Sequence, residues 1–512
     1  MSATTSPVPT AGVTADGAPP PADDGRRWAP TVGLWLGLAA LAVTLVVPPP
    51  EGLEPAGWRA AGVGLLMAAW WMTEALPIAA TSLAPLALFP VVGVAPIADA
   101  AAPYANPIIF LFLGGFLLAK GLERWSLHRR LALGVIARVG TRPRRIVLGF
   151  MLAAALLSMG ISNTATAVMM LPLALSVVDL ARRDDVGSAA DDHTFALVLM
   201  LGVAYACSIG GLGTLIGTPT NALLAAFVLE TYGVELTFAG WLAVGLPCVV
   251  VGLTVLYFML TRVIFPVRLP GLPGGQAFVR EQLDALGPVS APERRVALVF
   301  GAVALLWIFG PLVGRVLPGA SDAGTAIAGA LALFALPSGS RDEPGARLLD
   351  WETARTLPWG VLLLFGGGLS LAAAIADTGL ATWIGEALAV FGGLPTWALV
   401  GVVVAVIVVL TELTSNTATA AAFLPVLAAL ALTTGSDPSL MLVAATVAAS
   451  CAFMLPVATP ANAIAFGSGH VSIGEMARAG VWLNVLFTVL VTALAVFLVP
   501  FLVGTALPDL AP

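Results

Sequence analysis

Six residues suited to binding small ions occur twice in the sequence. The hexapeptide Ser-Asn-Thr-Ala-Thr-Ala stands at 162–167 and again at 415–420, each time in the middle of a long apolar stretch. Ser and Asn side chains carry oxygens that ligate a cation, and O–H and NH2 groups that donate hydrogen bonds to an anion. The two copies therefore predict two related sites for small ions.

Two further landmarks accompany each copy in the same order. The glycine-rich segments FLGG at 112–115 and LFGG at 364–367 come before it. The pentapeptides Gly-Thr-Pro-Thr-Asn at 217–221 and Ala-Thr-Pro-Ala-Asn at 458–462 come after it. One hexapeptide can recur by chance in a chain rich in Ala and Thr, but the three landmarks recur at nearly constant offsets of 252, 253 and 241 residues. This series indicates a duplication.

Where such a motif interrupts a membrane helix, the break exposes backbone groups that can bind ions. Peptide groups at a break lose their intrahelical partners, so carbonyls are free for a cation and N–H groups for an anion. Alone, Ser-Asn-Thr is usually a helix cap and Gly-Thr-Pro a turn. Paired interruptions in two halves of a membrane chain instead indicate a transporter binding site. Neither motif contains Lys or Arg, so a bound sodium would supply the positive charge beside an anion.

The composition places most of the chain in lipid. Of its 512 residues, 59% are hydrophobic and 10% are charged, whereas soluble proteins contain about 25% charged residues. Apolar stretches of about 20 residues, the length that crosses a bilayer, recur along the chain. We therefore predict an all-α polytopic protein that crosses the bacterial inner membrane many times. The short glycine-rich stretches 105–122 and 357–376 are expected to form re-entrant hairpins.

The sequence divides into four parts. Residues 1–28 are rich in Pro, Ala, Thr and Asp and are expected to be a disordered tail. Residues 29–265 hold the first helix and the first repeat, with its Ser-Asn-Thr at 162–164. A polar loop at 266–294 leads to the second repeat at 295–512, with its Ser-Asn-Thr at 415–417.

Several function classes are not supported by the sequence. No basic stripe points to nucleic acid. Cys207, Cys248 and Cys451 lie in apolar stretches without metal-ligand spacing, and the chain has three histidines. An integral-membrane enzyme would need clustered His, Cys or acidic groups, and ATP-driven transport a P-loop. We expect no enzyme, no organic cofactor and no nucleic-acid partner.

Glu412 is an ionisable residue within an apolar stretch, which makes it a functional candidate. It lies between Thr411 and the second Ser-Asn-Thr motif. It can therefore tune a cation site or relay a proton. Its counterpart in the first repeat is Met159, so the two repeats do not share this role.

At these motifs the sequence resembles the divalent-anion:sodium symporter family of dicarboxylate, citrate and sulfate carriers. The resemblance covers nearly the whole chain after the tail, and includes WWMTEALPIAATSLAPLALFP at 70–90 and SCAFMLPVATPANAIAFGSG at 450–469. It implies an inverted-repeat transporter with about eleven transmembrane helices and two re-entrant hairpins. It also implies a homodimer in contact with lipid, in which a transport portion moves across the membrane like an elevator.

The resemblance further implies which residues bind sodium and substrate. The first sodium site would use Ser158, Ser162, Asn163 and backbone at Gly211, and the second would use Thr411, Ser415, Asn416 and backbone at Ala458. The substrate would meet Ser162, Asn163, Thr164, Ser415, Asn416 and Thr417, with Thr218, Pro219, Thr459 and Pro460 closing the pocket.

The implied function is sodium-coupled import of a small anionic substrate, a C4-dicarboxylate such as succinate, malate or fumarate. Ser-Asn-Thr in both copies resembles the carboxylate-carrying branch more than the sulfate-carrying one. A sodium-independent dicarboxylate exchanger, or a sodium-coupled sulfate or citrate carrier on the same fold, remains an alternative.

Overall fold

A computed structural model describes residues 28–140, 142–183, 188–269, 271, 275–388 and 393–510. The expected tail at 1–28 lies outside these residues except for Trp28. In the described ranges the chain is helical, and two isolated β-bridges are the only extended pairing. The all-α prediction is confirmed.

The first half of the chain runs to a π-helix (Met259–Ile264) that continues its last long helix. Its helices are α1 (Ala29–Val46), α2 (Pro55–Thr73), α3 (Ile78–Thr81), α4 (Ala84–Val92), α5 (Ile97–Ala101), η1 (Ala102–Ala105), α6 (Pro107–Arg124), α7 (Leu127–Val139), α8 (Pro143–Ser158), α9 (Asn163–Arg183), α10 (Ala189–Gly211), α11 (Pro219–Tyr232) and α12 (Phe238–Phe258).

The second half is described together with the amphipathic helix of the polar loop, α13, and ends in the longest helix of the described chain. Its helices are α13 (Gly275–Ala285), α14 (Ala291–Ile308), α15 (Gly310–Val316), α16 (Asp322–Ala335), α17 (Trp351–Ala354), α18 (Trp359–Asp377), α19 (Leu380–Leu388), α20 (Thr396–Thr411), α21 (Asn416–Thr434), α22 (Pro438–Ala449), η4 (Pro456–Ala458), α23 (Pro460–Gly467) and α24 (Ile473–Leu502).

Eight helices of the described chain are long and apolar enough to cross a membrane. A ninth span arises if α14 and α15, which are bent by 84° at Phe309, are counted as one. Four shorter apolar helices, including α20 and α22, add to these. The chain is therefore a multi-pass membrane protein, and the number of eleven transmembrane helices stays a prediction.

The expected positions of the two hairpins are wrong. The ranges 105–122 and 357–376 fall mainly on α6 and α18, each of which is one continuous helix. Their glycines serve close packing: a Cβ at Gly114 would lie 2.6 Å from the Ala326 side chain of α16. Small residues that let membrane helices approach explain these glycine-rich stretches without a turn. The chain instead doubles back at the two Ser-Asn-Thr motifs.

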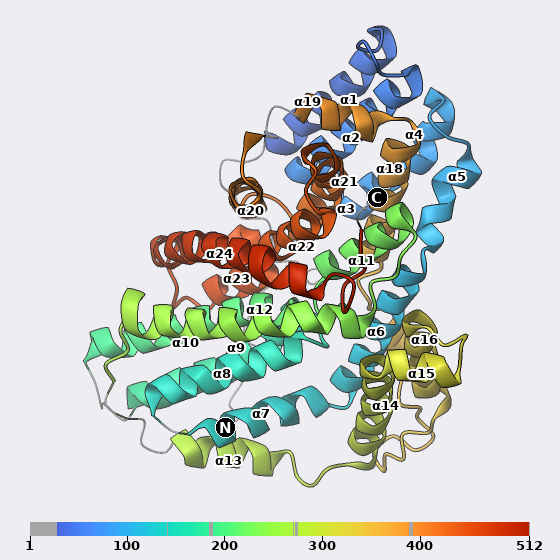
Figure 1. The fold of residues 1–512 in the computed structure, drawn as a ribbon. Coiled ribbons are helices and arrows are strands. Elements are labelled where there is room, and N and C mark those ends of the chain that lie inside the picture. The colour runs from blue at the N-terminus through green and yellow to red at the C-terminus, as the bar shows by residue number, and fades with distance from the viewer. Residues whose placement is uncertain are drawn as a thin grey trace, which may run out of the picture.

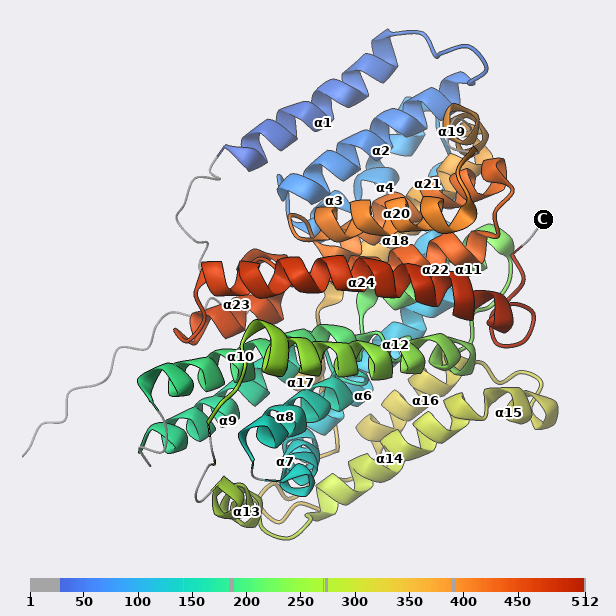
Figure 2. The ribbon, with the colours of Figure 1, turned by 60° about the vertical axis from the view of Figure 1, so that its left-hand side comes forward.

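The two halves of the chain interlock around the motifs. Helix α9, which begins at the first motif, contacts α23 of the second half, and α21, which begins at the second motif, contacts α11 of the first half. Helices α12 and α24, one from each half, lie side by side (Figures 1 and 2). Helices α1–α2 and α14–α16 lie at opposite ends of the molecule in both views. The motifs are thus at the centre of the fold.

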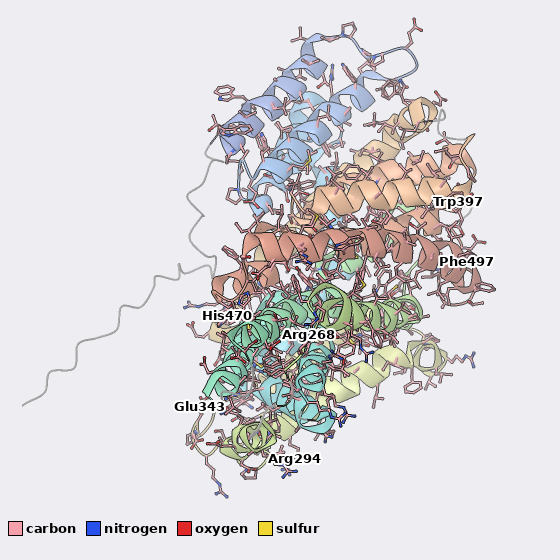
Figure 3. The ribbon with its side chains drawn as sticks, turned by 90° about the vertical axis from the view of Figure 1, so that its left-hand side faces the viewer. Arg268, Arg294, Glu343, Trp397, His470 and Phe497 are labelled. Carbon is pink, nitrogen blue, oxygen red and sulfur yellow. The ribbon has the colours of Figure 1, made fainter. Side chains whose placement is uncertain are left out.

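The outer helices expose apolar side chains. Over its most apolar stretch, α1 has 17% of its residues buried and α24 has 22%, against 94% for the central helix α10. Trp397 of α20 and Phe497 of α24 extend from the edge of the molecule (Figure 3). Apolar surface of this extent suits a lipid environment.

A buried ion pair fastens α7 to the start of α14. Arg130 Nε lies 2.8 Å from Glu293 Oε1, and both side chains are largely shielded from solvent. The same guanidinium donates to the carbonyls of Leu286 at 3.1 Å and Gly287 at 2.9 Å. Glu293 also accepts from the Ser290 N–H at 2.7 Å, as part of a capping box. Arg130 thus ties the amphipathic helix α7 to the loop between α13 and α14.

Arg130→Ala is expected to destabilise the protein by about 3 kcal/mol, because it leaves the buried Glu293 carboxylate without its cation. Thermal unfolding in detergent measures this as a lower melting temperature. Arg138→Ala is the matched control, since the Arg138 guanidinium donates to the Gly134 carbonyl in its own helix. Equal melting temperatures for the two variants would contradict the role of Arg130.

Candidate functional site

The two Ser-Asn-Thr motifs make the same local structure. In each, a helix ends, a short turn follows, and the next helix begins at Asn163 or Asn416. The Ser158 hydroxyl donates to Asn163 Oδ1, and the Thr411 hydroxyl donates to Asn416 Oδ1 at 2.7 Å. Both bonds span five residues, so each asparagine amide is held at the turn by the last residue of the preceding helix.

The side chains of both motifs are half-buried. Ser162 Oγ accepts from the Ala165 N–H at 3.2 Å and so caps α9. Ser415 occupies the matching N-cap of α21, but its side chain makes no capping bond. Because the first N–H groups of a helix lack intrahelical partners, both turns combine backbone donors with hydroxyl and amide groups. Such a set can receive a carboxylate.

Each half of the chain also contains a broken helix, whose loop is bound by an asparagine. Asn221 Nδ2 donates to the carbonyls of Gly211 at 3.1 Å and Thr214 at 2.8 Å. In the second half, Asn462 Nδ2 donates to the carbonyls of Ala452 and Leu455, both at 3.1 Å. Donors and acceptors are all 241 residues apart in the sequence. The duplication is therefore visible in individual hydrogen bonds.

The first turn lies directly against the first break. A Cβ at Gly211 would come 2.8 Å from Asn163 Oδ1. One at Gly217 would come 3.0 Å from the Ser158 carbonyl. Of the residues expected at the first sodium site, Ser158, Asn163 and Gly211 are thus brought together, and Ser162 stands in the same turn. Hydroxyl, amide and backbone oxygens are the ligands that a hard cation prefers.

The second Ser-Asn-Thr turn likewise lies against the broken helix of its own half, formed by α22 and α23. Thr411 Oγ1 also lies 2.7 Å from the carbonyl oxygen of Ala449, at the end of α22, so its single proton is shared between this oxygen and Asn416 Oδ1. Ala458, expected at this site, is buried in the turn η4 immediately before Thr459. Ala449 was missed in the sequence because an alanine in an apolar run carries no polar signal. Its carbonyl becomes relevant only where the helix ends.

Thr-Pro begins the second half of each broken helix. Thr218 is the N-cap of α11, with Pro219 at its first position, and Thr459 is the N-cap of α23, with Pro460 at its first position. Proline suits this position because its missing N–H would be unpaired there anyway. Thr220 and Ser450 hydroxyls lie 2.9 Å apart, which joins the break of one half to that of the other.

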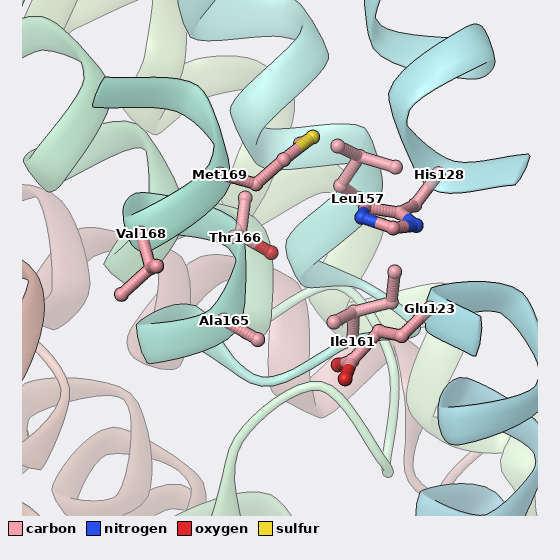
Figure 4. A pocket seen from close by; sticks show the side chains of 8 residues that line it. All are labelled: Glu123, His128, Leu157, Ile161, Ala165, Thr166, Val168 and Met169. Carbon is pink, nitrogen blue, oxygen red and sulfur yellow. The ribbon is translucent and has the colours of Figure 1, made fainter. Parts of the chain in front are cut away.

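A cavity of about 250 Å³ adjoins the first motif (Figure 4). It separates the end of α6 and the start of α7 from the turn between α8 and α9. The Thr166 hydroxyl that faces it is buried and has no hydrogen-bond partner within the described chain. Burial lowers the pKa of His128 at its wall, which favours the neutral imidazole. The cavity is lined by Glu123, His128, Leu157, Ile161, Ala165, Thr166, Val168 and Met169.

A family model described as the sodium:sulfate symporter transmembrane region matches residues 29–504. The chain belongs to this family. Similar relatives are the sodium-dependent dicarboxylate transporters SdcS of Staphylococcus saprophyticus and of Staphylococcus aureus strain USA300. They are 42% identical over 478 and 480 residues, which cover 92% of this chain and 92% of each relative. As a member of the family the chain is a multi-pass inner-membrane transporter and not an enzyme.

A solved structure supports the fold of this family member. The transporter YdaH of Alcanivorax borkumensis aligns with a TM-score of 0.56, covering 94% of this chain and all of YdaH, at 16% identity. At that identity the likeness concerns the fold alone. The family and its relatives agree with the resemblance inferred from the two Ser-Asn-Thr motifs and the C-terminal stretch at 450–469.

Proposed function

We propose that this protein imports C4-dicarboxylates together with sodium. One observation carries the proposal: each Ser-Asn-Thr turn is bound to the helix end before it, and the first lies against the broken helix of its own half. Hydroxyl, amide and carbonyl oxygens at such a place favour sodium. The relatives named as sodium-dependent dicarboxylate transporters supply the substrate class.

The two sodium ions sit one at each turn. The first is held by Ser158, Ser162, Asn163 and backbone at Gly211, and the second by Thr411, Ser415, Asn416 and backbone at Ala458. The dicarboxylate lies between the turns, held by Ser162, Asn163, Thr164, Ser415, Asn416 and Thr417, with Thr218, Pro219, Thr459 and Pro460 around it. The pairing of α9 with α23 and of α11 with α21 supports this arrangement, because it brings each motif helix to the other half.

Residues 29–265 and 295–512 act as two repeats of one unit. The matching hydrogen bonds at Asn163 and Asn416, and at Asn221 and Asn462, support this division. Two copies associate, and the portion that carries the turns moves across the membrane like an elevator. The apolar outer faces of the molecule are available to lipid and to a second copy.

Succinate uptake into proteoliposomes tests the function. An inward sodium gradient should drive uptake of labelled succinate, potassium should not replace sodium, and excess malate should compete. Uptake that ignores sodium but needs internal dicarboxylate would make the protein an exchanger. Competition by sulfate but not by malate would make it a sulfate carrier, the substrate in the family's description.

A further inference from the structure

A carboxylate holds the loop that breaks the second of the paired helices. Glu412 directly follows α20, and its side chain is buried. Its Oε1 accepts from the N–H groups of Phe453 at 2.6 Å and Met454 at 2.9 Å, and its Oε2 accepts from that of Leu455 at 3.1 Å. Three consecutive backbone donors of the break are thus bound to one side chain.

Helix α24 closes the other side of this arrangement. Asn484 Nδ2 donates to Glu412 Oε1 at 2.8 Å. One turn earlier in α24, a Cβ at Gly480 would lie 2.5 Å from the Met454 nitrogen. The loop is therefore packed between Glu412 and α24, with its N–H groups directed at the carboxylate. Charge-assisted bonds of this kind are about twice as strong as neutral ones.

The first half holds the equivalent loop by different means. Met159 stands in place of Glu412, and its carbonyl accepts from the Thr214 hydroxyl. Trp241 of α12 donates from Nε1 to the Leu212 carbonyl at 2.9 Å. Here the loop donates through the Thr214 hydroxyl and accepts through the Leu212 carbonyl. Among the described contacts, no carboxylate accepts from its backbone N–H groups. The two breaks are related in chain path but not in how they are fixed.

We propose that Glu412 is a positioning residue for the second sodium site. It is the residue after Thr411, so one short segment carries both the Thr411 hydroxyl and the carboxylate that anchors the loop. Leu455 accepts from Asn462 through its carbonyl while it donates to Glu412, so the anchor continues to the start of α23. Loosening the carboxylate lets the backbone oxygens of this break move away from Thr411 and Asn416. The inference rests on the proposed function, because it presumes sodium at this turn.

Glu412→Gln tests the inference, because glutamine keeps the size of the side chain but turns one acceptor oxygen into a donor that faces an N–H group. Loss of one hydrogen bond to a charged group should raise the sodium concentration at half-maximal succinate uptake about tenfold, equivalent to about 1.4 kcal/mol. Maximal uptake at saturating sodium should return to near the wild-type rate. Asn484→Ala, which removes one donor, should shift sodium dependence in the same direction by less.

Glu386→Gln is the matched control, since Glu386 is an exposed residue of α19, next to Gly385, which packs near Thr433 at the end of α21 opposite the motif. Its sodium dependence should equal that of wild type. If wild-type uptake does not depend on sodium, the proposed function fails. If wild-type uptake depends on sodium but Glu412→Gln and Asn484→Ala keep the wild-type half-maximal concentration, only the role of Glu412 fails. A lower maximal rate at an unchanged half-maximal concentration also overturns it.

Discussion

Asn163→Ala and Asn416→Ala are each expected to reduce succinate uptake by about a hundredfold or more, a loss of about 2.8 kcal/mol. Each asparagine provides the amide oxygen that is bound by Ser158 or Thr411, and each begins the helix whose N-terminus faces the site. In the proposed arrangement, alanine removes a cation ligand and an anion donor in one step. Uptake into proteoliposomes at saturating sodium measures the loss.

The control for the two asparagine variants is Thr254→Ala. Thr254 lies on α12, and its hydroxyl donates to the Val250 carbonyl in its own helix. All three variants should be recovered from membranes in similar amounts and elute from size-exclusion chromatography as wild type does. Normal uptake by either asparagine variant would show that its turn does not bind sodium or substrate.

Gly480→Ala is the second change with a large expected effect. A Cβ there would lie 2.5 Å from the Met454 nitrogen in the loop between α22 and α23. The loop must shift, at a cost of about 2 kcal/mol. If this cost falls on the conformation that binds sodium and substrate, uptake should fall about thirtyfold. Gly245→Ala should likewise displace the loop between α10 and α11 and reduce uptake, because a Cβ there would lie 2.5 Å from the Leu212 carbonyl oxygen.

Gly474→Ala is the control for this pair, since Gly474 is in α24 and a Cβ there meets no atom within 4 Å. It should leave uptake unchanged, and alanine is the better helix former. Uptake and the sodium concentration at half-maximal uptake are measured for all three. Equal uptake by Gly480→Ala and Gly474→Ala would show that α24 does not fix the loop.

Much of the candidate site could be proposed from the sequence because its polar residues stand out among apolar ones. Asn163, Asn416 and the Thr-Pro pairs at 218–219 and 459–460 are conspicuous among Ala, Val and Leu, and their spacing repeats. The spacing of Ser158 and Thr411 from each asparagine also matches hydrogen bonds in the structure. A duplicated pattern that has to satisfy buried backbone groups leaves few alternatives.

The remaining features depend on packing that one sequence does not disclose. The glycine-rich stretches at 112–115 and 364–367 resemble turns in sequence, yet they are helix surfaces that let neighbouring helices approach. Glu412 was a candidate from its position, but its partners lie 41 to 72 residues further along the chain. Only the folded chain shows that the carboxylate binds backbone donors.

The most direct test of two sodium sites is the ratio of sodium to succinate taken up. Wild-type proteoliposomes given labelled sodium and labelled succinate should take up at least two sodium ions for each succinate, because both turns bind one. A ratio of one, with uptake abolished in Asn163→Ala but retained in Asn416→Ala or the reverse, would contradict the account, since a single turn would then suffice.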